Sequence, residues 1–67
     1  MDEEKRERFI KLLKQELQNR NIGIMKFASM IGVTRMTVYR WFNGKASMSL
    51  DVYYKILEVL GWEDKAI

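Results

Sequence analysis

The chain has 67 residues, of which 48% are hydrophobic and 31% are charged, and it contains no cysteine and no histidine. This length suits one small domain and excludes a two-domain enzyme, so we expect residues 1–67 to form a single domain. Without cysteine there can be no disulfide or thiolate metal site, and without histidine no imidazole catalysis or imidazole ligand. We therefore expect neither enzyme activity, nor a cofactor, nor a metal site.

No apolar run approaches the roughly 18 to 20 residues that cross a membrane. The first four residues, Met-Asp-Glu-Glu, also differ from a secretory signal, which starts basic and continues apolar. These features predict a soluble protein with no membrane partner.

The formal net charge of +3 is unevenly distributed along the chain. Residues 1–20 carry six bases and five acids, and residues 51–67 carry two bases and four acids. Residues 21–50 carry four bases and no acid; the bases are Lys26, Arg35, Arg40 and Lys45. This basic centre indicates a surface that faces a polyanion, most simply nucleic acid, although a solvated positive face without a function is the alternative.

The first predicted helix starts at the cap residue Asp2, and acids in its first turn favour the positive end of the helix dipole. Apolar residues then recur at helical spacing and predict a broad buried stripe made of Phe9, Ile10, Leu12, Leu13 and Leu17. The polar run 19–21 ends this helix.

Three further helices follow from caps and stop signals. A short helix over Ile24–Ile31 ends at Gly32, and Thr34 caps the next one, Arg35–Phe42, which Asn43-Gly44 ends. Ser49 caps a fourth helix that ends at Gly61, with an inner face made of Leu50, Tyr53, Ile56, Leu57 and Leu60. No repeat or strand pattern is present.

The unit 24–43 contains two short helices joined by only three residues, which forces them to cross steeply. Such a crossing needs a small residue at the contact, a glycine in the turn and apolar residues where the helices touch. The sequence provides Ala28, Gly32 and the set Phe27, Ile31, Val33, Val38 and Trp41. This pattern is typical of a DNA-binding helix-turn-helix. Trp41 is interpreted as a core residue rather than a stacking platform.

The chain resembles the Cro and CI type repressor domains of phages and related bacterial regulators. The stretch Phe27–Thr34 is similar to that family's helix-turn-helix core, 41–45 (WFNGK) to the end of its recognition helix, and Leu50–Gly61 to its fourth helix. The resemblance implies an all-α, lambda-repressor-like fold of four to five helices and a cytoplasmic transcription regulator in a bacterium or phage-infected host. It also implies that the helix Arg35–Phe42 enters the major groove of an operator.

Helical geometry and the resemblance together give the expected DNA contacts. Base contacts are expected from Arg35, Met36, Tyr39 and Arg40, and backbone contacts from Lys26, Thr34, Thr37, Asn43 and Lys45. Met36 is either a contact to a thymine methyl or a tolerated surface methionine, and Thr37 equally suits the helix start.

Three departures from the family pattern affect these expectations. Ile24 stands where the family often has a phosphate-binding glutamine, so that contact is either absent or replaced by Lys26 or by free backbone N–H groups at the helix start. Phe42 stands where a glutamate is common and is expected in the core. The fifth helix is cut short, so we expect a weak or DNA-induced homodimer through Trp62 and Ile67.

The alternative function is a module of the same fold that binds a partner repressor, as an antirepressor or antitoxin does. The apolar side chains of Ile24, Met25 and Met36 would suit such a partner, whereas Arg35 and Arg40 favour DNA.

Overall fold

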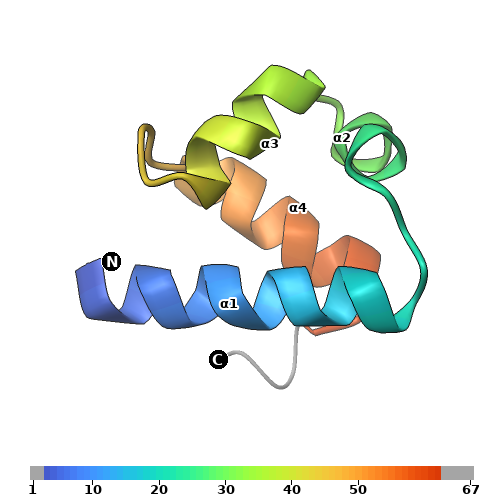
Figure 1. The fold of residues 1–67 in the computed structure, drawn as a ribbon, viewed down its shortest axis with the longest axis horizontal. Helices are drawn as coiled ribbons and strands as arrows, with labels where there is room; N and C mark the ends of the chain where they lie inside the picture. The colour runs from blue at the N-terminus through green and yellow to red at the C-terminus, as the bar shows by residue number, and fades with distance from the viewer. Residues whose placement is uncertain (1–2, 63–67) are drawn as a thin grey trace.

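The computed structural model describes residues 3–62, which form four α-helices and contain no strand. The helices are α1 Glu3–Asn19, α2 Ile24–Ile31, α3 Arg35–Phe42 and α4 Leu50–Leu60 (Figure 1). The expected all-α fold of four to five helices is confirmed, with four helices in this range. The expected cap Asp2 lies outside the described residues.

Helix ends follow the expected signals. The side-chain oxygens of Thr34 and Ser49 each accept a hydrogen bond from the backbone N–H three residues later, at 3.3 and 3.2 Å. Gly32 and Gly61 follow α2 and α4 with φ of 77° and 72°. A residue with a β-carbon would be strained in this left-handed conformation, so glycine ends both helices at low cost.

One hydrophobic core joins all four helices. Leu13, Phe27, Val38 and Ile56, one from each helix, have no exposed surface. The other buried members are Phe9, Ile10, Leu17, Ala28, Ile31, Trp41, Leu57 and Leu60. Trp41 is only 5% exposed, so its predicted place in the core is confirmed.

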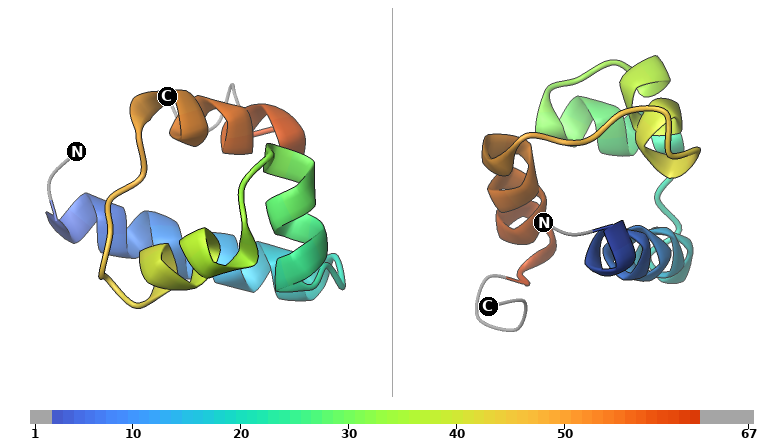
Figure 2. Two further views of the ribbon diagram at one scale, coloured as in Figure 1. Left: turned by 90° about the horizontal axis from the view of Figure 1, so that it is seen from above. Right: turned by 90° about the vertical axis from the view of Figure 1, so that its left-hand side faces the viewer.

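The helices α2 and α3 cross steeply, as the short connection predicts. Figure 1 shows α2 nearly end-on while α3 runs across the view, and the side view in Figure 2 places both above α1 and α4. Ala28 is 3% exposed, and its carbonyl accepts a hydrogen bond from the N–H of Val33 at 2.9 Å. The small side chain of Ala28 therefore lies buried next to the turn that sets the crossing.

Two expected core residues are on the surface instead. Leu12 is 62% exposed, because Phe9, Leu13 and Leu17 occupy the inward side of α1 and helical periodicity turns Leu12 away from them. Leu50 is 65% exposed, because it lies in the first turn of α4, whereas the buried residues of α4 begin at Ile56. The buried stripe of α1 is thus narrower than predicted, and that of α4 is shorter.

Candidate nucleic-acid interface

The outer face of α3 carries the four side chains expected to contact bases. Val38 and Trp41 are buried, and the helical repeat then turns the opposite side of α3 toward solvent. Met36 is 64% exposed and Tyr39 46% exposed. Arg35 and Arg40 are also exposed, so the structure brings together Arg35, Met36, Tyr39 and Arg40.

Arg35 is oriented by a contact across the turn of the motif. Its guanidinium donates to the sulfur of Met25 on α2, at 4.0 Å between Nη1 and Sδ. A thioether is a weak acceptor, so this contact orients Arg35 without neutralising its charge. The free N–H groups of the guanidinium remain available to another acceptor.

The residues expected to contact the DNA backbone flank α3. Lys26 is exposed on α2, and Asn43 and Lys45 are exposed directly after α3. Thr34 is exposed and Thr37 half-buried, and their hydroxyl oxygens lie 3.0 Å apart. The Thr34 hydroxyl also accepts the Thr37 N–H, so both threonines take part in hydrogen bonds at the start of α3.

A tight turn fixes the segment that follows α3. Gly44 has φ of 72°, and the N–H of Lys45 donates to the carbonyl of Arg40 at 2.8 Å. The N–H of Asn43 donates to the carbonyl of Tyr39 at 2.9 Å. These bonds hold Asn43 and Lys45 immediately beyond the end of α3.

The start of α2 has no side-chain cap, because the residue before it is Gly23. The first helical bond runs from the N–H of Phe27 to the carbonyl of Gly23, so the preceding amides of α2 have no partner within the helix. Ile24 is half-buried against the core. Only part of the Ile24 side chain is therefore exposed beside Met25.

Among residues 3–62, no ion pair lies at the candidate interface. Within residues 3–62 the ion pairs all lie on α1 or join it to Arg20, the residue directly after it; they join Arg6 to Glu3, Arg8 to Glu4, and Arg20 to Glu16. The bases Lys26, Arg35, Arg40 and Lys45 thus have no carboxylate partner in the part of the chain that the structure describes. The same residues 3–62 hold no group of carboxylates placed to bind a metal.

The sequence did not predict a contact between α1 and the end of α3. The ammonium of Lys14 lies over the ring of Phe42, 5.3 Å from its centroid. Phe42 itself is half-buried against the core, so its expected burial is only partial. An exposed cation–π contact of this kind contributes about 0.5–1 kcal/mol. The one feature of the sequence that could have indicated this contact is Phe42 itself, an aromatic residue at a position where Cro and CI type domains often have a glutamate.

A helix-turn-helix family model matches residues 13–64, which is most of the chain and includes the whole α2–α3 unit. The chain belongs to the helix-turn-helix family. The match is of the XRE type, which confirms the resemblance to the Cro and CI type domains and identifies a DNA-binding transcription regulator. No curated protein and no solved structure matches the chain.

In this helix-turn-helix protein, α2 and α3 are the two helices that the short turn 32–34 joins. Across residues 3–62, no helix has the length and apolar character needed to span a membrane.

Proposed function

We propose that this helix-turn-helix protein is a sequence-specific repressor that inserts α3 into the major groove of an operator. One observation carries the proposal: two arginines, an exposed methionine and a tyrosine share the solvent side of α3, inside the acid-free segment 21–50. Such a protein would act in the cytoplasm of a bacterium or a phage-infected host, where it would occupy its operator and block transcription.

In this proposal the base contacts come from α3. Arg35 lies in the first turn of α3 and pairs through two N–H groups with O6 and N7 of guanine. Met36, beside it, packs on the methyl group of a thymine. Tyr39 and Arg40, one turn further along the exposed side, reach neighbouring base edges.

The phosphate contacts come from both ends of the motif. Lys26 on α2 and Lys45 after α3 each neutralise one phosphate, and Asn43 donates its amide to another. Thr34 keeps a hydroxyl hydrogen for phosphate if Thr37 donates the hydrogen bond that joins the two oxygens. These contacts fix the register of α3 but do not read the sequence.

Selection from a random pool of duplexes tests the proposal. A repressor of this kind enriches a short common sequence, and gel shifts on that sequence weaken steeply between ~100 and ~300 mM salt, since phosphate binding releases counterions. A pool without any enriched sequence would refute specific recognition.

We propose further that two copies pair on DNA. One recognition helix covers half of a site, and dimers of this motif read half-sites about 34 Å apart. Trp62 is half-buried, and its ring packs edge-on against that of Phe9 with 6.1 Å between the ring centroids. Part of the indole is therefore exposed and could contact a second copy of the chain. Ile67, the other residue expected in this contact, lies outside the described residues.

Sedimentation at micromolar protein checks this pairing. The expected result is a monomer or weak dimer alone and two copies on a duplex with two half-sites, because a shared duplex raises the effective concentration. One copy per duplex would contradict pairing, and a tight dimer without DNA would show that the contact is stronger than proposed.

A second candidate function is binding to a partner repressor, as an antirepressor or antitoxin does. Its supporting observation is that Met25 and Met36 are 68% and 64% exposed on the motif. A protein that binds no duplex even at low salt, but co-sediments with a purified Cro or CI type repressor, would favour this function.

A further inference from the structure

The basic residues of α1 and its final turn differ in whether a carboxylate compensates them. Arg6, Arg8 and Arg20 each form an ion pair with a glutamate three or four residues away. Lys14 has no acid at these spacings, because its helical neighbours are Ile10, Lys11, Leu17 and Gln18. Within residues 3–62, no carboxylate lies within ion-pair distance of Lys14. Its charge meets an aromatic ring instead.

That ring belongs to Phe42, the last residue of α3. The ammonium of Lys14 lies 5.3 Å from the ring centroid, so a cation on α1 is held at the end of the recognition helix. The face of an aromatic ring attracts a cation through its quadrupole but carries no net charge. The contact therefore restrains Lys14 and leaves its full positive charge available, which an ion pair would not do.

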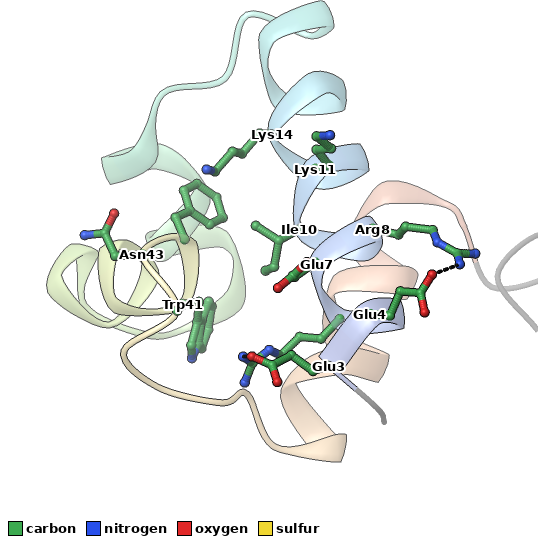
Figure 3. A pocket seen from close by; sticks show the side chains of 12 residues that line it. Glu3, Glu4, Glu7, Arg8, Ile10, Lys11, Lys14, Trp41 and Asn43 are labelled. Atoms are coloured by element: carbon green, nitrogen blue, oxygen red, sulfur yellow. Dashed lines mark hydrogen bonds and ion pairs between the residues drawn. The ribbon is translucent and has the colours of Figure 1, made fainter.

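Charged side chains of both signs line a cavity next to Lys14, and Arg6 and Arg8 lie among its acids. A surface cavity of about 670 Å³ lies between α1 and the end of α3 (Figure 3). Lys11 and Lys14 line it together with Asn43 and Gly44, whereas Glu3, Glu4 and Glu7 line it further toward the start of α1. Glu3 and Glu4 are paired with arginines. No acid after Glu7 lines the cavity, so the part next to Lys11 and Lys14 is basic.

Lys14 also lies between the start of α2 and the end of α3. A second cavity, of about 500 Å³, runs from Lys11, Lys14 and Phe42 to the uncapped start of α2 at Gly23 and Ile24. Lys14 and Phe42 line both cavities. An anion between the start of α2 and the end of α3 would therefore approach the ammonium of Lys14.

We propose that Lys14 contacts the sugar-phosphate backbone of DNA and that Phe42 is a positioning residue that holds the lysine for this contact. The inference rests on the proposed function, since the phosphate is that of the duplex whose major groove receives α3. Restraint by the ring lowers the conformational entropy that a free lysine would lose on binding. The DNA surface thereby extends from α2 and α3 onto α1.

The test compares Lys14→Gln with Lys55→Gln, which removes the same charge from an exposed lysine of α4 flanked by Asp51 and Glu58 at helical spacing. Binding is measured by fluorescence anisotropy on the selected duplex and on a random duplex, at several salt concentrations. Lys14→Gln should weaken both complexes alike and lower the slope of log K against log salt by about 0.9, the value of one phosphate contact. Lys14→Arg should keep the slope, and Lys55→Gln should match the parent protein.

Phe42 is tested in the same assay. Phe42→Leu keeps an apolar side chain but removes the ring, so the affinity for DNA should fall. In this background Lys14→Gln should cause a smaller loss of affinity than it does in the parent protein. In the Phe42→Tyr background, which keeps a ring, Lys14→Gln should cause the same loss as in the parent protein. A thermal melt of each variant confirms that binding is measured on folded protein. An unchanged salt slope in Lys14→Gln, or full additivity of the two substitutions, would overturn the inference. If the parent protein binds no duplex at all, the proposed function fails instead.

Discussion

The substitution Ala28→Leu tests the helix crossing on which the interface depends. Ala28 is 3% exposed in the core, beside the turn between α2 and α3, and a leucine adds three carbon atoms there. Overpacking of this kind costs about 1–3 kcal/mol. A domain of 67 residues has a free energy of unfolding of only about 3–10 kcal/mol, at 0.05–0.15 kcal/mol per residue. The loss is therefore a large part of the total stability.

Thermal unfolding followed by circular dichroism measures the effect. For a domain of this size each kcal/mol lowers Tm by about 4–8 °C, so Ala28→Leu should lower Tm by at least about 4 °C. The matched control is Ser29→Leu, which makes a similar change at the next residue of α2, where the side chain is exposed. A Tm of Ala28→Leu equal to that of the parent or higher would refute the tight crossing and the resulting exposure of α3.

Two predictions concern DNA binding. Arg35→Ala should cost about 1–3 kcal/mol on the selected duplex and flatten the preference at one base pair, because a bidentate contact is lost; equal weakening on random duplexes would make Arg35 a phosphate contact. Lys45→Ala should weaken binding to all duplexes alike and lower the log–log salt slope by about one, as measured by titration at several salt concentrations; an unchanged slope would leave Lys45 in solvent.

The helices were predictable because their signals are local. A cap such as Thr34 acts within three residues, and a glycine such as Gly32 acts on the carbonyls of the turn before it. The bounds of α2, α3 and α4 accordingly agree with the expected ranges. The outward face of α3 was predictable for the same reason, because burying Val38 and Trp41 leaves only one side of a short helix exposed.

Contacts between distant segments were not predictable from these patterns. Lys14 and Phe42 are 28 positions apart, and no periodicity connects α1 with the last residue of α3. The same holds for Arg6, whose guanidinium donates to the hydroxyl of Ser47 at 3.0 Å, and for Arg20, which donates to the carbonyl of Leu60 at 2.8 Å. Periodicity identifies the apolar side of a helix, but it does not show how much of the helix length other helices cover. The sequence therefore predicted burial of Leu50, which is exposed in the structure.

The net charge of +3 is small, but acids and bases are unevenly distributed over the surface of the molecule. Three acids of α1, Glu3, Glu4 and Glu16, are paired with arginines, so these three compensate charge locally and do not oppose the bases of the motif. Between residues 21 and 50 every formal charge is positive and none has a carboxylate partner within residues 3–62. A duplex approaching α3 therefore meets the full charge of Arg35 and Arg40, whereas one approaching the outer side of α4 meets Asp51 and Glu58 on either side of Lys55. The long-range electrostatic field of the protein thus turns α3 toward the duplex before any base is contacted.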